Sequence, residues 1–193
     1  MNQGEAGGSA GPQVIMIVRH GEKPPEDGGP PHGITRDGDH DRHALITRGW
    51  ARAGALVGLF APVDASPRPP LVRPERVYAA HPTDGKHRRE SETVSLVADQ
   101  LGVRLEMPCA VGQEEELAAR VREHDGATLV CWDHLRIPDL VESFGVVEPP
   151  VPAAWPPERF DMVYLLPRTS PGSYALTQVP QLLLPGDSPE PIG

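Results

Sequence analysis

Two apolar runs, 13–18 and 127–132, each lead into a histidine. The first reads QVIMIV and continues directly into Arg19 and His20, and the second reads ATLVCW and is followed after one residue by His134. Short apolar runs rich in β-branched residues are typical of strands buried on both faces. If the two strands are neighbours in a parallel sheet, both histidines lie at its carboxyl edge, where open α/β sheets bind their ligands.

A third apolar run brings arginines toward the same edge. Residues 76–80 (RVYAA) lead through a polar loop to Arg88 and Arg89. Arginine offers forked donors that match phosphate oxygens, and a neutral histidine can act as a covalent nucleophile. Two histidines with arginines at one sheet edge therefore predict a pocket for a phosphoryl group.

The elements that must position these residues alternate between strand and helix patterns over the first 145 residues. This alternation predicts an α/β fold, a three-layer α/β/α sandwich with a largely parallel central sheet. We expect Thr47 to cap the first helix, and the last two strands to form an antiparallel hairpin at the sheet edge. Strands are expected at 13–18, 76–80, 103–106, 127–132, 160–166 and 173–178, and helices at 47–60, 88–101, 113–123 and 138–144.

The remaining segments read as loops and tails. Residues 1–12 are Gly-rich and polar and are expected to form a flexible tail, and residues 185–193 are expected to be a loose second tail. Between them, 13–184 is expected to be one catalytic domain. The Pro-, Gly-, Asp- and His-rich segment 21–43 reads as a long functional loop.

Composition narrows the class of protein. The net charge of −9 argues against general nucleic-acid binding, although a local cluster of Arg and His can still bind an anion. No stretch resembles a membrane span or a signal peptide, so the expected location is the cytoplasm. Cys109 and Cys131 are far apart in the sequence and suggest neither a disulfide framework nor a zinc site.

The run VRHGEKP at 18–24 resembles the RHG signature of the histidine phosphatase superfamily, which includes phosphoglycerate mutase-like enzymes. LITRGWARA is similar to the LTxxGxxQA segment of that superfamily. RESET at 89–93 is similar to its later R-x-x-x-T segment, and CWDHLRIP holds the position of its second active-site histidine. The four motifs occur in the superfamily's order across roughly residues 14–145.

The resemblance implies a phosphoglycerate mutase-like fold and a metal-independent phosphatase that needs no cofactor. His20 would attack phosphorus and form a phosphohistidine, which water then hydrolyses. Arg19, Arg89 and His134 would surround the phosphoryl oxygens and stabilise the transition state. The chain is short and acidic, which favours hydrolysis of a phosphomonoester or phosphoanhydride over mutase activity. The expected substrate is a phosphorylated small molecule or a phosphoprotein, and no oligomeric state is indicated.

The reaction also requires a proton donor for the leaving group, which no motif identifies. The acidic run 114–116 is otherwise a favourable helix start, and Arg88 reads as a surface charge. Trp132 and Trp155 are expected to pack in the core or at its rim. The proton-donor candidates are Glu114, Glu115 and Asp133, with Glu22 a weaker one, and the expected substrate contacts are Glu22, Lys23 and His81.

Two departures from the superfamily motifs keep alternatives open. His134 lies between Asp133 and Leu135 rather than between glycines, and the loop after Ala80 lacks the usual serine. The same fold could therefore serve as a phospholigand-binding or interaction module with little catalysis. A metal hydrolase built on the acidic and histidine residues of 37–43 is a third hypothesis, although their spacing matches no defined metal site.

Overall fold

The computed structural model describes residues 12–83 and 85–193. The predicted flexible tail, 1–12, lies outside the described residues except for Pro12. No helix in the described ranges is both long enough and apolar enough to cross a membrane.

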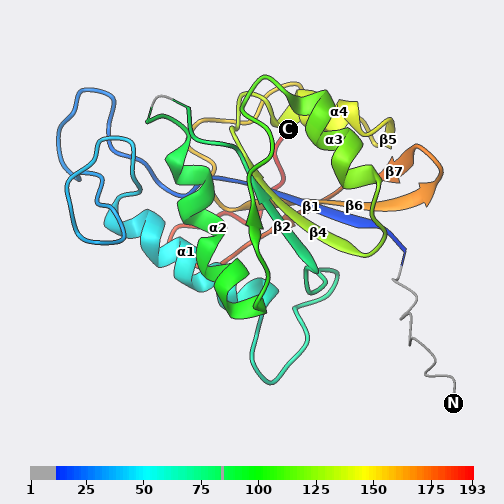
Figure 1. Cartoon of the computed structure of the whole chain (residues 1–193), viewed down its shortest axis with the longest axis horizontal. Coiled ribbons are helices and arrows are strands. Elements are labelled where there is room, and N and C mark those ends of the chain that lie inside the picture. The colour runs from blue at the N-terminus through cyan, green and yellow to red at the C-terminus, as the bar shows by residue number, and fades with distance from the viewer. Residues whose placement is uncertain (1–11, 84) are drawn as a thin grey trace, which may run out of the picture.

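A central mixed sheet organises the molecule (Figure 1). Strands β3, β2, β4 and β1 are neighbours in that order and all run parallel, whereas β6 pairs antiparallel with the other side of β1. The largely parallel sheet predicted from the sequence is thus confirmed. The strands are β1 (Val14–Arg19), β2 (Arg76–Ala79), β3 (Leu105–Glu106), β4 (Ala127–Trp132), β5 (Val146–Glu148), β6 (Met162–Ser170), β7 (Ser173–Ala175) and β8 (Thr177–Pro180).

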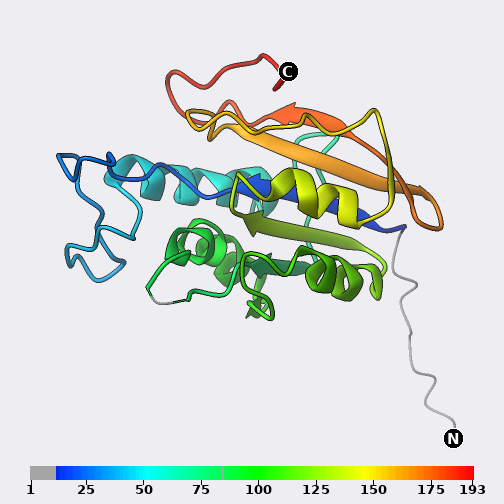
Figure 2. The same cartoon turned by 90° about the horizontal axis from the view of Figure 1, so that it is seen from above.

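Helices cover both faces of this sheet, as Figures 1 and 2 show. Helices α1 (Thr47–Phe60) and α2 (Arg88–Leu101) pack on one face, and α3 (Glu114–Arg122) and α4 (Ile137–Ser143) pack on the other. Alternate residues of β1 enter the two cores: Ile15 and Ile17 face α3 and α4, while Met16 and Val18 face α1 and α2. This double burial explains why β1 is an unbroken apolar run, and the three-layer prediction is confirmed.

The C-terminal strands pair antiparallel, as the predicted hairpin requires, but they differ from it in two details. β6 lies inside the sheet beside β1, and the region predicted as one strand at 173–178 forms two strands that pair with β6 on either side of Leu176. The backbone N–H of Leu176 donates to Glu148 at 2.8 Å instead of pairing with β6. β5, which the sequence pattern did not predict, joins the sheet through β7.

Two local predictions are also wrong. Thr47 is the first residue of α1, and Ile46, whose side chain has no acceptor, occupies the capping position. Residues 185–193 are packed rather than loose: the side chain of Asp187 is buried against Arg52, and Ile192 is buried and exchanges hydrogen bonds with the side chain of Gln178. The polar composition of this tail concealed contacts that its charged and amide groups make with distant residues.

The long loop after β1 returns to α1 at a very close contact between glycines. A Cβ built on Gly49 would lie 2.6 Å from the backbone oxygen of Glu22 and 2.9 Å from its nitrogen. A Cβ on Gly21 would in turn lie 3.1 Å from the Cα of Gly49. The start of α1 can therefore support the loop that follows His20 only because Gly49 has no side chain.

We expect Gly49→Ala to destabilise the protein by about 1–3 kcal/mol, because the new methyl group must displace the backbone of Glu22. Gly54→Ala is the matched control, since a Cβ at Gly54 meets nothing within 4 Å and alanine favours the same helix. Urea unfolding of both variants measures the difference. Equal stabilities would contradict the close contact.

Candidate functional site

The parallel pairing of β1 with β4 places two histidines side by side. Arg19 is in register with Trp132, so the chain leaves both strands at the same edge of the sheet. The ring centroids of His20 and His134 are 6.1 Å apart, with the rings nearly perpendicular. Both side chains are almost fully buried, with His20 3% and His134 8% exposed.

His20 is held in one tautomer by its own backbone turn. Its Nδ1 lies 2.7 Å from the carbonyl oxygen of Gly21, which can only accept, so Nδ1 carries the proton and Nε2 carries a free lone pair. Burial and the adjacent charge of Arg19 lower the pKa of His20 well below 6.5. The imidazole is therefore neutral near pH 7, which is the form required of a nucleophile.

Arg19 is buried directly beside His20. Its Nη1 donates to the carbonyls of Pro157 at 2.7 Å and Arg159 at 3.0 Å, and its Cζ lies 4.0 Å from the ring centroid of Phe160. Its buried Nε and Nη2 have no hydrogen-bond partner among the described residues. Burial lowers the pKa of Arg19 to about 10, partly offset by Asp133, so the guanidinium stays charged at neutral pH. Unpartnered charged donors in a buried place call for an anionic ligand.

Arg89 and Thr93 attach α2 to this site. The guanidinium of Arg89 donates to the carbonyls of Arg42 at 2.9 Å and Ala44 at 3.3 Å. The hydroxyl of Thr93 accepts from the backbone N–H of Gly21 at 2.8 Å and donates to the carbonyl of Arg89 at 2.7 Å. The RESET motif thus holds the turn after His20 through Thr93.

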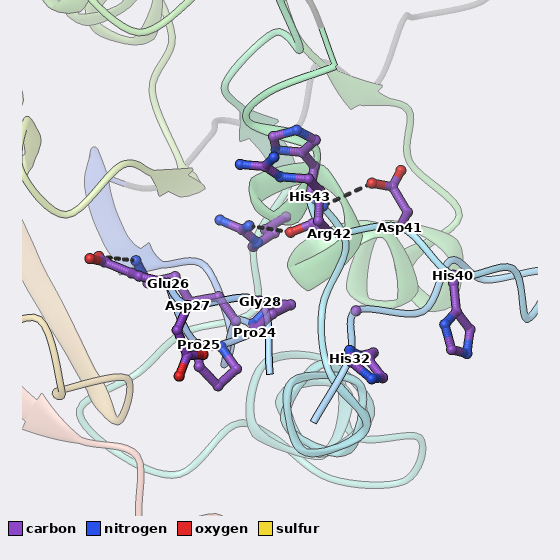
Figure 3. Close-up of a pocket in the computed structure, with 13 residues that line it drawn as sticks. Pro24, Pro25, Glu26, Asp27, Gly28, His32, His40, Asp41, Arg42 and His43 are labelled. Atoms are coloured by element: carbon purple, nitrogen blue, oxygen red, sulfur yellow. Dashed lines mark hydrogen bonds and ion pairs between the residues drawn. The ribbon is translucent and has the colours of Figure 1, made fainter. Parts of the chain in front are cut away.

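A cavity of about 650 Å³ opens next to Arg89 (Figure 3). Segments 23–28 and 40–43 of the long loop face each other across it, and Lys23 and Arg89 are the predicted site residues that line it. Arg88 instead pairs with Asp41 at 2.7 Å. His20 is not among the residues that line this cavity.

The structure separates the three predicted proton donors. The carboxylate of Glu114 accepts from Trp132 Nε1, Arg136 and the N–H of Gly112; burial alone would raise its pKa, but these hydrogen bonds lower it. Glu115 is exposed on the same helix, near Arg136. Asp133 alone of the three lies beside a histidine of the site: its Oδ1 is 4.0 Å from Nδ1 of His134.

Two of the three predicted substrate contacts lie elsewhere. The carboxylate of Glu22 is bound by Arg52 at 2.8 Å and Arg48 at 3.0 Å, so it supports the loop instead of facing a ligand. His81 is exposed and does not line the cavity, and its backbone N–H donates to Cys109. Lys23 lines the cavity, and its charge helps to lower the pKa of His134, after burial and Arg19.

Sequence reasoning missed the segment that covers Arg19. Pro157, Arg159 and Phe160 reach the end of β1 from the connection before β6. Trp155 is buried in this segment, as predicted, where its ring packs at a tilt against Tyr164 and its Nε1 donates to the carbonyl of Arg159. A proline-rich connection carries no pattern that predicts which charged group its carbonyls will bind.

Potential metal ligands gather at a different place from the one the sequence suggested. Within the described residues, a group of three with ligand atoms inside 4.8 Å of one another is formed by His87, Glu90 and Asp133. The residues of 37–43 form no such group there, although the rings of His32 and His40 lie 5.5 Å apart. The hypothesis of a metal hydrolase on this loop therefore has no structural support.

A buried ion-pair network supports the loop after His20. Arg52 of α1 is 2% exposed and contacts the carboxylates of Glu22 and Asp187, each at 2.8 Å. Asp187 also accepts from the backbone N–H groups of Leu183 and Leu184. Burial alone would raise the pKa of Asp187, but its bonds to Arg52 and to these N–H groups lower it. The C-terminal segment is thereby joined to the residues around His20.

Comparisons with known proteins identify the fold. No family model and no curated protein sequence matches the chain. Among solved structures, it is similar to the protein histidine phosphatase SixA complexed with tungstate, with 19% identity, a TM-score of 0.55, and coverage of 88% of this chain and 97% of that one. A putative alpha-ribazole-5'-P phosphatase from Escherichia coli has 13% identity, a TM-score of 0.54, and coverage of 86% and 95%. The fold predicted from the sequence motifs is confirmed.

We expect Asp187→Asn to lower the free energy of unfolding by about 3 kcal/mol at pH 7, because it removes one of the two charges that compensate buried Arg52. The pKa of Asp187 in the folded protein lies below its ordinary value of 3.8. Its stabilisation is therefore complete above about pH 4 and is lost as the pH falls through the folded value. Urea unfolding of wild type and variant should show their difference shrinking with acidification; a pH-independent difference would contradict the ion pair.

The pKa values of three histidines near the site are shifted in opposite directions from 6.5. His20 and His134 are expected to stay neutral below pH 6.5, with the pKa of His134 near about 4, because burial and Arg19 disfavour their charged forms. His87 is expected to protonate above pH 6.5, because it is hydrogen-bonded to Glu90. NMR titration of the imidazole signals, assigned with single His→Ala variants, measures all three. A charged His20 at pH 6.5 would contradict the proposed electrostatics.

Proposed function

We propose that this chain is a metal-independent phosphatase that hydrolyses a phosphomonoester or phosphoanhydride through a phosphohistidine on His20. The observation that carries the proposal is the pairing of a neutral, tautomerically fixed His20 with the unpartnered donors of Arg19. A lone pair beside buried positive donors is the arrangement needed for in-line attack on a phosphoryl group.

In the first step, Nε2 of His20 attacks phosphorus and the bond to the leaving oxygen breaks. Arg19 and Arg89 neutralise the charge on the transferring phosphoryl oxygens, and neutral His134 donates its one ring N–H to a phosphoryl oxygen. Asp133 supplies the proton to the leaving oxygen, since Glu114 and Glu115 are directed elsewhere. In the second step, water attacks the phosphohistidine, Asp133 takes the proton from that water, and inorganic phosphate leaves.

The fold agrees with this chemistry. The similar solved structures include proteins described as a protein histidine phosphatase and as an alpha-ribazole-5'-P phosphatase, which differ in the kind of molecule they act on. For this chain the proposed substrate is a phosphorylated small molecule or a phosphoprotein. The cavity beside Lys23 and Arg89 would hold the part of the substrate beyond the phosphoryl group.

We expect His20→Ala to lower the rate of aryl phosphate hydrolysis by about a thousandfold or more, with chelator present throughout, because it removes the nucleophile. His81→Ala is the matched control, since that histidine is exposed and lies outside the cavity, and it should retain wild-type activity. Phosphate release measured by a colorimetric assay distinguishes the variants. Equal activity of His20→Ala and wild type would refute the proposal.

A second candidate is a phospholigand-binding module with little turnover. It is favoured by the surroundings of His134, which lies between Asp133 and Leu135 rather than between glycines. Calorimetry with vanadate separates the two candidates when the wild type is folded but inactive. The binding module is supported if vanadate binds and if Arg19→Ala and Arg89→Ala weaken that binding. If vanadate does not bind, both candidates are rejected.

A further inference from the structure

A second cluster of polar side chains lies beside the phosphoryl pocket. His87 immediately precedes α2, Glu90 lies in the first turn of that helix, and Asp133 follows β4. Nδ1 of His87 is 3.3 Å from Oε1 of Glu90 and 3.9 Å from Oδ2 of Asp133. The backbone of His87 is left-handed, with φ of 60°, a conformation that is uncommon outside glycine but that histidine, asparagine and aspartate adopt more often than other residues. The imidazole lies against the first turn of the helix that follows, where it contacts Glu90.

Glu90 provides the independent sign that a ligand belongs in this cluster. Its side chain is 1% exposed, and its Oε2 has no hydrogen-bond partner in the part of the chain that the structure describes. An unsatisfied buried carboxylate oxygen costs free energy that a bound cation would recover. The imidazole of His87 contacts the other carboxylate oxygen, Oε1, and leaves Oε2 without a partner.

We propose that His87, Glu90 and Asp133 bind a divalent transition-metal ion of the Zn²⁺ type. One imidazole nitrogen and two carboxylates are a common donor set for such ions, with water as the fourth ligand. Donor distances near 2.1 Å in a tetrahedral site separate the ligand atoms by about 3.4 Å. The observed separations of 3.3 and 3.9 Å need only a small side-chain movement to reach that geometry.

The charges around the cluster favour a cation with moderate affinity. Glu90 and Asp133 together offset the two charges of the ion. Arg19 and Arg89, which interact electrostatically with both carboxylates, oppose part of this attraction. A phosphate bound to the two arginines would reduce their opposition, so the ion and the phosphoryl ligand should strengthen each other's binding.

The cation site does not depend on the proposed phosphatase activity, because the three ligands and their distances are independent of turnover at His20. An ion on Asp133 would remove the proposed proton donor, which makes bound metal an inhibitor rather than a cofactor. Ion binding is therefore the property to measure, with a readout that needs no catalysis.

The test is calorimetric titration of the full chain with Zn²⁺, together with the visible absorption spectrum of Co²⁺ added in its place. We expect one saturable ion per chain, and an affinity at least about tenfold weaker in Glu90→Gln and in Asp133→Asn. Glu92→Gln is the matched control: Glu92 is a buried carboxylate of the same helix that accepts from the N–H of Leu45 outside the cluster, and this variant should bind as the wild type does.

Two results would overturn the site. Wild type that binds neither ion would mean that Glu90 and Asp133 act only as counter-charges to the arginines. The ion would instead lie on the long loop if Glu90→Gln and Asp133→Asn leave its affinity unchanged and His40→Ala weakens it. Circular dichroism confirms that each variant is folded, and Asp133→Asn, on a different element from Glu90, guards against a local effect of the helix substitution.

Discussion

The parallel pairing of β1 with β4 is the constraint on which the site depends. Both strands are buried on both faces, so their register is set by two hydrophobic cores at once. A shift of one residue would exchange the residues that face α1 and α2 with those that face α3 and α4. The register leaves Arg19 opposite Trp132 and delivers His20 and His134 to one edge, within ring contact. The geometry at this edge therefore depends on apolar packing well away from it.

Although the chain has a net negative charge, three arginines lie around that edge. Arg19 and Arg52 are almost fully buried and Arg89 is half-buried, and each has a different compensation. Arg52 is satisfied by two carboxylates, and its pKa is raised, because its bonds to Asp187 and Glu22 outweigh the effect of burial. The pKa values of Arg19 and Arg89 are instead lowered by burial, since carbonyls rather than paired carboxylates contact them. The incompletely compensated pair is the one available to an anion, while the compensated arginine is structural.

Several segments distant in sequence complete the site. Thr93 of α2 accepts the N–H of Gly21, Gly49 of α1 approaches Glu22, and the connection before β6 covers Arg19 with its carbonyls. The C-terminal segment contributes Asp187 to the network under the loop. Each contact restrains the turn that holds His20 in its tautomer, which is the preorganisation that the proposed nucleophile requires.

The sequence by itself determined the alternation of strands and helices, the three layers, and the positions of His20, His134 and Arg89 at element ends, because hydrophobic periodicity and short motifs are local properties of the chain. It also predicted the core position of Trp155. Only the tertiary structure showed that Glu22 supports the loop, that Glu114 is engaged by Trp132, that residues 185–193 are packed, and that Glu90 joins His87 and Asp133. These facts depend on which charged group lies against a backbone or side chain that is distant in the sequence. The stability of such a contact comes from burial and charge pairing in the folded protein, which no local sequence pattern encodes.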